Sequence, residues 1–129
     1  YGIEENLSWK KTLGEQWKEY ESLFPEINKS SIDQISLEFA GSNVPPELMR
    51  LLPDKEIMVG VIGVVNDHIE TADEVKDNII EALKHMDSER LIACSNCGMA
   101  PISVNVARSK IRALGLGAEL AYKQIKNNL

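Results

Sequence analysis

The two cysteines of the chain, Cys94 and Cys97, stand in the stretch CSNCGMAP with a Cys-x-x-Cys spacing. Such a pair can form a redox couple, supply half of a metal site, or contain one working thiol beside a bystander. A redox couple needs its first cysteine at a helix N-terminus, and Gly98 and Pro101 intervene before the next helical pattern. For zinc the pair supplies only half of the ligands, and a buried Cys can also be a plain small apolar residue.

A carboxylate and a histidine are the other side chains that could do chemistry. Glu38 lies in SLEFAGSN, on the face of an expected strand opposite to Leu37 and Phe39. If both faces are buried, its carboxylate must be paired, protonated or bound to a metal; otherwise it reaches solvent or a lysine at the strand end. His68 in VVNDHIET, after the next apolar run, could be a general acid or base, or a loop histidine without chemistry.

Three apolar runs predict the buried strands that would carry these residues, at 34–39, 57–64 and 90–93. The middle run is apolar on both faces, as in a parallel strand that is covered on both sides. Helical patterns separate the runs, and strands that alternate with helices predict an α/β fold with a parallel sheet. In α/β barrels the C-terminal ends of the strands face the active site, so Glu38 and Cys97 would share that end.

The helical patterns have recognisable starts and apolar faces. Residues 14–28 carry apolar side chains at helical spacing, and Thr71 and Glu74 form a capping box that opens the second helix. The apolar residues of the last helix fall at steps of four and three: Ala107, Ile111, Leu114, Ala118, Ala121 and Ile125. Gly115 and Gly117 inside it each cost about 1 kcal/mol relative to Ala, so close packing against a neighbour is expected there.

Composition limits the class of protein. With 129 residues, of which 43% are hydrophobic and 26% charged, the chain has the character of one globular domain. A net charge of -6 argues against nucleic acid and anionic membranes as partners, since both favour clustered Lys and Arg. No apolar run approaches the roughly 18 residues of a membrane span, and no signal peptide is visible. Two cysteines do not make a disulfide scaffold, so a reduced, cytoplasmic setting is expected.

Several stretches together resemble the C-terminal part of the catalytic barrel of cobalamin-independent methionine synthases and their relatives. These stretches are DQISLEFAGSN, DKEIMVGVIGVVNDHIETADEV and SERLIACSNCGMAP, followed by the last helix. The resemblance runs in order from about residue 17 to about residue 126, and it is closer to short single-barrel members than to long two-barrel enzymes. Its most specific parts are the strand that bears a Glu, the ETADEV helix start and the Asn-Cys-Gly turn.

The resemblance implies a zinc enzyme on a TIM (β/α)8 barrel, of which residues 1–129 would form the C-terminal half with strands six to eight. Members transfer a methyl group to the thiol of homocysteine, which forms methionine, and related barrels use other thiols. The donor is methyl-tetrahydrofolate or, in single-barrel forms, a methyl-corrinoid or another methylated compound. By motif, Glu38 matches the glutamate ligand of the zinc and Cys97 matches the last cysteine ligand. Cys94 falls where the family needs no thiol, so it would be incidental.

Two departures from the family pattern matter. The family also binds zinc through a His-x-Cys motif on an earlier strand, and these 129 residues contain no such motif. Tyr1 and Gly2 could be the residues just after it, so the N-terminal half with the remaining ligands is expected to be absent. The long enzymes place an assisting loop His where a gap-free match puts Val65 here. No catalytic function is therefore assigned to His68.

Two alternatives stay open at the level of the sequence. One is a non-catalytic half-barrel that has lost the zinc ligands. The other is a barrel similar to uroporphyrinogen decarboxylases, although the SNCGMAP turn favours the thiol methyltransferases. In each case a sheet of three strands has two open edges, so we expect it to pack against the missing half of the barrel or a second copy of the chain.

Overall fold

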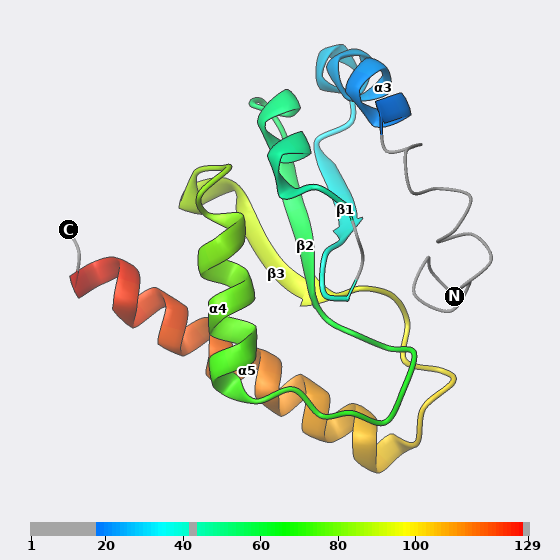
Figure 1. The fold of residues 1–129 in the computed structure, drawn as a ribbon, viewed down its shortest axis with the longest axis vertical. Helices are drawn as coiled ribbons and strands as arrows, with labels where there is room; N and C mark the ends of the chain where they lie inside the picture. Colours follow the sequence, from blue (N-terminus) through cyan, green and yellow to red (C-terminus); the bar gives the residue numbers. More distant parts are fainter. Residues whose placement is uncertain (1–17, 42–43, 128–129) are drawn as a thin grey trace.

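The computed structural model describes residues 18–41 and 44–127, in which helices alternate with strands (Figure 1). The strands are β1 (Gln34–Glu38), β2 (Glu56–Ile62) and β3 (Leu91–Ser95). The helices are α3 (Lys18–Lys29), α4 (Ala72–Ala82) and α5 (Val104–Asn127), with short 3-10 helices η1 (Pro46–Leu51) and η2 (Ser88–Arg90) before β2 and β3. All three predicted strands are confirmed, with small shifts at their ends. The part of the predicted first helix before residue 18 lies outside the described residues.

The three strands form one parallel sheet in the order β1-β2-β3, as the alternation of strands and helices predicted. Ile35, Ile57 and Leu91 stand in register across the sheet. The arrowheads of the strands point the same way, toward the loops that lead into α4 and α5 (Figure 1). These loops therefore lie at the C-terminal end of the sheet, where the candidate residues were expected.

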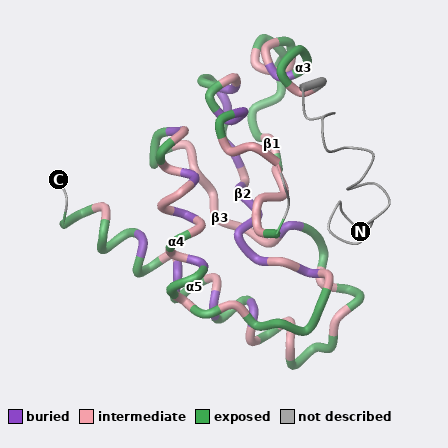
Figure 2. The backbone as a smooth tube through the Cα atoms, in the orientation of Figure 1, coloured by how far each residue is buried: buried purple, intermediate pink, exposed green. Residues whose placement is uncertain are grey.

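The apolar core is centred on β2, the middle strand. Ile57, Val59 and Val61 of β2 have no exposed surface, and neither has Val75 of α4, which belongs to the same core cluster. Figure 2 shows buried stretches in both β2 and α4. Burying a side chain of this size contributes roughly 1.5–3 kcal/mol each. The run Gly60–Ile62 is buried on both faces, which confirms that β2 is covered on both sides near its C-terminal end.

Helix α4 begins at the capping box that the sequence predicted. The backbone N–H of Glu74 donates to the Thr71 hydroxyl (3.2 Å), and the backbone N–H of Thr71 donates to the Glu74 carboxylate (2.7 Å). Two N–H groups that a helix start would leave without partners are thereby satisfied. The hydrogen bond from the Thr71 backbone also lowers the pKa of Glu74 below its ordinary value.

The buried face of α5 differs from the one that its apolar residues predicted. Lys110, Ala113, Gly117 and Ala121 are buried, whereas Ile111 keeps 54% of its surface exposed. The face that packs in the fold is thus rotated by about one residue from the predicted stripe. A lysine and a glycine occupy the contact instead of larger apolar side chains.

The two glycines of α5 have different surroundings. A Cβ atom on Gly117 would lie 2.4 Å from the Cβ of Val75, because α5 packs directly against α4 at this point. Close packing therefore explains Gly117, as predicted. A Cβ atom on Gly115 would meet nothing within 4 Å, so the same expectation is wrong for Gly115.

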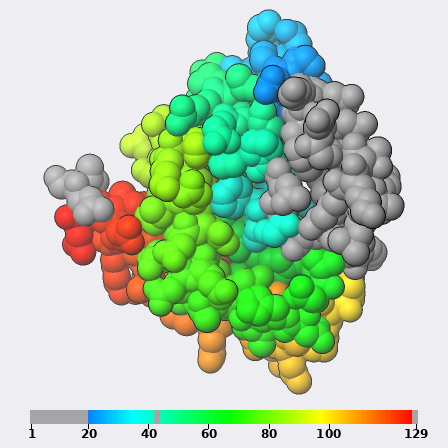
Figure 3. Space-filling view, viewed as in Figure 1, coloured from blue at the N-terminus to red at the C-terminus, as the bar shows by residue number. Residues whose placement is uncertain are grey.

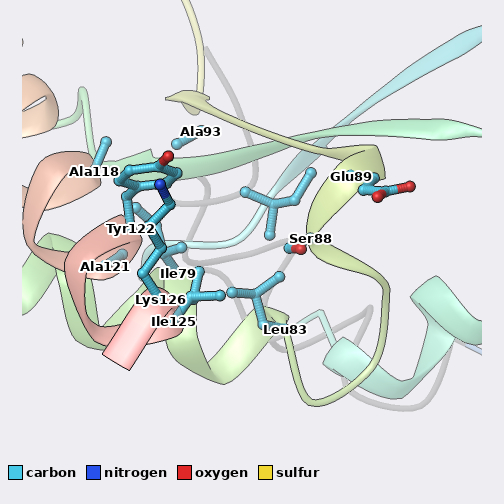
Figure 4. Close-up of a pocket in the computed structure, with 11 residues that line it drawn as sticks. Ile79, Leu83, Ser88, Glu89, Ala93, Ala118, Ala121, Tyr122, Ile125 and Lys126 are labelled. Carbon is cyan, nitrogen blue, oxygen red and sulfur yellow. The ribbon is translucent and has the colours of Figure 1, made fainter. Parts of the chain in front are cut away.

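The edge of the sheet at β3 is open on its helical side. A cavity of about 390 Å³ lies between α4, β3 and α5, with a mostly apolar wall to which Leu83 and Tyr122 contribute (Figure 4). The C-terminal part of α5 projects beyond α4 at the left of the space-filling view (Figure 3). Val104 and Ile111, in the N-terminal half of the same helix, are also exposed. Among the residues described, no helix has the length and apolar character needed to cross a membrane.

Candidate functional site

Glu38 and Cys97 lie at the same end of the sheet. Glu38 is the last residue of β1 and is half-buried, whereas Cys97 follows the last residue of β3 by two positions and is exposed. The loop after β2 begins at this end too. In α/β folds the C-terminal ends of parallel strands carry the binding and active sites. The fold thus brings a carboxylate and a thiol to the end of the sheet at which active sites of α/β folds are usually found.

The side chain of Glu38 projects from the face of the sheet opposite α4 and α5. Leu91 and Ala93 line the cavity between β3 and these helices, so Cys94 points to the other face. Cys94 stands in register with Gly60, and Gly60 stands in register with Glu38. Glu38 and Cys94 therefore occupy one row of the sheet, with only a glycine between them.

Cys94 is the less accessible thiol of the pair. It is half-buried, and this burial raises the pKa of its thiol above the ordinary value, while a hydrogen bond with Ser36 offsets part of the rise. The thiolate is the form that binds metals and attacks electrophiles, and a raised pKa reduces its population at neutral pH. Cys97 is the exposed thiol of the pair.

A buried amide beside Cys97 joins the ends of all three strands. The backbone N–H of Asn96 donates to the carbonyl of Ile62 at the end of β2 (2.8 Å). Its side chain accepts from the backbone N–H of Phe39 (3.2 Å) and donates to the carbonyl of Ala40 (2.7 Å), both just after β1. Sequence reasoning noticed Asn96 only as a neighbour of Cys97, and Gly60 inside an apolar strand was the available signal of a close approach.

The loop after β2 is fixed by a buried ion pair with α5. The Nζ of Lys110, which has no exposed surface, lies 2.9 Å from a carboxylate oxygen of Glu70 and also donates to the carbonyl of His68. The other oxygen of Glu70 accepts from the backbone N–H of Gly63 (2.8 Å). Sequence reasoning missed this pair, because its two members are 40 positions apart.

His68 borders a separate polar cavity rather than a cluster of potential metal ligands. This cavity of about 370 Å³ lies between the ends of β1 and β2 and the start of α4. The Nε2 of His68 lies 3.6 Å from a carboxylate oxygen of Glu74, and both side chains are more than half exposed. An exposed pair of this kind contributes little to stability.

Glu38 and Cys97 fit zinc in chemistry but do not complete a site. Zinc accepts both carboxylate oxygen and thiolate sulfur, and it normally takes four ligands. Within residues 18–41 and 44–127, no group of three or more His, Cys, Asp or Glu side chains is placed to hold a metal ion. A complete site needs further ligands from outside the described part of the chain.

Longer proteins are similar in sequence to this chain. A methionine synthase of Saccharolobus islandicus is 33% identical over 110 residues, which is 84% of this chain and 33% of that protein. A methionine synthase of Sulfurisphaera tokodaii is 31% identical over 109 residues, which is 84% of this chain and 32% of that protein. The chain therefore spans about a third of the length of these relatives.

A solved structure shares the fold. It is a B12-independent methionine synthase from Shewanella sp. W3-18-1 in complex with selenomethionine, with 50% identity and a TM-score of 0.89. The match covers 98% of this chain and 37% of that one, so the parallel strands and their helices correspond to part of the barrel of that synthase. The family model described as cobalamin-independent synthase, catalytic domain, matches residues 17–119. The chain therefore belongs to the cobalamin-independent synthase catalytic domain family.

Proposed function

We propose that this chain is the part of a zinc-dependent methyltransferase that supplies strands six to eight of the barrel and two zinc ligands, Glu38 and Cys97. The whole enzyme transfers a methyl group from methyl-tetrahydrofolate or a methyl-corrinoid to the thiol of homocysteine and so forms methionine. One observation carries the proposal: a carboxylate and an exposed thiol share the C-terminal end of one sheet, in a chain of this family.

The reaction requires an activated sulfur. The thiol loses its proton, and the sulfur forms a bond to the methyl carbon while the bond between that carbon and its donor breaks. The donor keeps the electron pair of the broken bond, so a tetrahydrofolate nitrogen takes up a proton, whereas a corrinoid cobalt retains the pair. When bound, zinc lowers the pKa of a coordinated thiol and so favours the thiolate at neutral pH. In the proposal Glu38 and Cys97 hold the metal at the strand ends, and no catalytic function is assigned to His68.

The similar proteins support homocysteine as the methyl acceptor. The related structure from Shewanella sp. W3-18-1 contains selenomethionine, which has the shape of the methylated product. A barrel of this family therefore accommodates a methionine-type amino acid. We extend that substrate class to the enzyme that contains this chain. Because both described cysteines are free thiols, we also infer a reducing compartment, the cytoplasm.

Residues outside this chain must complete the site. The 129 residues contain no His-x-Cys motif, so at most two of the zinc ligands that the family uses are present. The isolated chain should accordingly bind zinc only weakly and should not transfer methyl groups. Equilibrium dialysis of the isolated chain measures this directly, and submicromolar zinc affinity would contradict the proposed division of ligands.

The decisive experiment uses the native gene product that carries this chain. We expect one zinc ion per protein molecule in the wild type, measured by atomic absorption, and a loss of zinc in Cys97→Ser and Glu38→Ala. Cys94→Ser is the matched control, because it removes the other thiol of the same turn and should leave the zinc content unchanged. Methyl transfer to homocysteine, tested with both donors, should follow the zinc content.

The alternative is a non-catalytic barrel segment. Absence of zinc in the wild-type gene product, under conditions that preserve its fold, would favour that alternative. Equal zinc content in the wild type and in the Cys97 and Glu38 variants would instead place the metal elsewhere. Membership of the synthase family favours the methyltransferase over a barrel of the uroporphyrinogen decarboxylase kind.

A further inference from the structure

Asn96 is a buried polar residue at the centre of the strand ends. Only 8% of its surface is exposed. Its amide oxygen accepts a hydrogen bond from the backbone N–H of Phe39, and its amide nitrogen donates one to the carbonyl of Ala40, both just after β1. A buried amide that gains both an acceptor and a donor contact holds two chain segments in one relative position.

Gly60 provides the space in which Asn96 lies. A Cβ atom on Gly60 would stand 2.3 Å from the Oδ1 of Asn96 and 2.8 Å from its Cα. The second contact is with backbone, so a side-chain rotation could not relieve it. Gly60 also accepts hydrogen bonds at its carbonyl from Phe39 (3.1 Å) and Ala40 (2.6 Å). The glycine in the middle strand therefore lets the ends of the outer strands meet.

These contacts act on the two candidate zinc ligands through the chain. Glu38 directly precedes Phe39, and Cys97 directly follows Asn96. We propose that Asn96, packed on Gly60, is a positioning residue that fixes the separation of Glu38 and Cys97 and so preorganises the metal site. This inference rests on the proposed function and adds two residues, Asn96 and Gly60, that act on the candidate ligands through the backbone.

The chemistry of the contact requires an amide. Alanine offers neither the acceptor for Phe39 nor the donor for Ala40. Aspartate keeps an oxygen for the N–H of Phe39, but it has no N–H group for the carbonyl of Ala40. We therefore expect Asn96→Asp to retain part of the effect of Asn96 and Asn96→Ala to lose it.

The test measures metal binding in the native gene product that carries this chain. Zinc affinity comes from competition with a chelator, and absorption of the cobalt-substituted protein reports the geometry of the ligands. Substituting a residue that orients metal ligands typically weakens metal affinity by roughly ten- to a hundredfold. We therefore expect Asn96→Ala to weaken zinc affinity within that range. Asn66→Ala is the control, because Asn66 lies in the loop after β2 and accepts a local hydrogen bond from the backbone N–H of His68.

Folding and positioning are separated by the conditions of the measurement. Affinities are compared at a temperature at which circular dichroism shows each metal-free variant to be fully folded. Asn96→Asp takes the place of Asn96→Ala if the latter does not fold, and a weaker zinc affinity than that of the wild type is then the expected result. A changed cobalt spectrum in the Asn96 variant, with an unchanged spectrum in Asn66→Ala, supports positioning.

The outcomes distinguish this inference from the proposed function. If the wild type binds zinc and the Asn96 variant binds it with equal affinity and an unchanged cobalt spectrum, the positioning function is refuted and the zinc site stands. If the wild type binds no zinc, both fall together. If Asn66→Ala weakens zinc binding as much as Asn96→Ala, then loss of any polar side chain at this end of the barrel weakens binding. That result also overturns the inference.

Discussion

At the scale of single residues, burial distinguishes the two cysteines that share one motif. The two are three positions apart, yet Cys94 is half-buried with a raised thiol pKa and Cys97 is exposed. The motif alone left a redox pair, a metal half-site and a single working thiol as alternatives. Because Cys97 is exposed, it is the thiol of the pair that a metal ion or an electrophile can reach directly.

Alkylation of the metal-free chain should therefore be selective. Iodoacetamide should modify Cys97 well before Cys94 at neutral pH, as peptide mass spectrometry would show. The pKa of Cys94 is raised, so its thiolate fraction, and with it its rate, should increase as the pH rises above neutrality. Cys97→Ser is the control, since it should leave only the slow reaction. Equal rates at the two thiols would contradict the difference in burial.

At the scale of elements, two glycines two positions apart in α5 have opposite expected effects. Gly117 packs against Val75 of α4, whereas Gly115 has free space where a side chain would be. Sequence reasoning treated the two alike, because helix propensity assigns each the same cost. Only the position of the neighbouring helix separates them.

Substitution by alanine should reveal this difference. Gly115→Ala should raise the free energy of unfolding by up to about 1 kcal/mol, because alanine favours the helix and meets no neighbour. Gly117→Ala should lower it by roughly 1–3 kcal/mol, because the added methyl group collides with Val75 and with the backbone of α4. Urea unfolding monitored by circular dichroism measures both, and changes of the same sign would refute the packing described for α5.

Sequence patterns predicted local features and missed long-range ones. The capping box at Thr71, the strand that contains Glu38 and the turn that bears Cys97 are read from a few consecutive residues. The bonds of Asn96 to Phe39 span 57 positions, and the pair of Lys110 with Glu70 spans 40. No periodicity in the sequence encodes such pairs. The apolar pattern of α5 therefore predicted a buried Ile111, whereas the structure buries its neighbour Lys110, which pairs with Glu70.

At the scale of the whole molecule, the described residues have the open surfaces expected of a partial barrel. The cavity of about 390 Å³ lies beside β3, and α5 carries exposed apolar side chains, among them Tyr122 at the cavity. The related structure from Shewanella is much longer than this chain, which covers 37% of it. The prediction that this edge packs against another part of the barrel, or against a second copy, follows from these observations.

The isolated chain should therefore self-associate through this edge. In sedimentation velocity its weight-average mass should increase with concentration, and Tyr122→Lys should weaken the association because it puts a charge beside the apolar cavity. Gln124→Lys, on an exposed position of the same helix, is the matched control and should leave the association unchanged. A monomer at all concentrations would contradict this prediction.

The buried contact between Lys110 and Glu70 has a consequence for how sequences of this kind can change over time. Losing one partner leaves the other charge buried with backbone contacts in place of its counter-charge, and breaking a buried pair costs about 3–5 kcal/mol. That is a large share of the stability of an ordinary domain. A single replacement at either position would therefore be selected against, and a joint exchange for two apolar residues would also remove the partners of the His68 carbonyl and the Gly63 N–H. The two positions should consequently change together and keep a polar pair, which links the sequence of the final helix to that of the loop after β2 at this one contact.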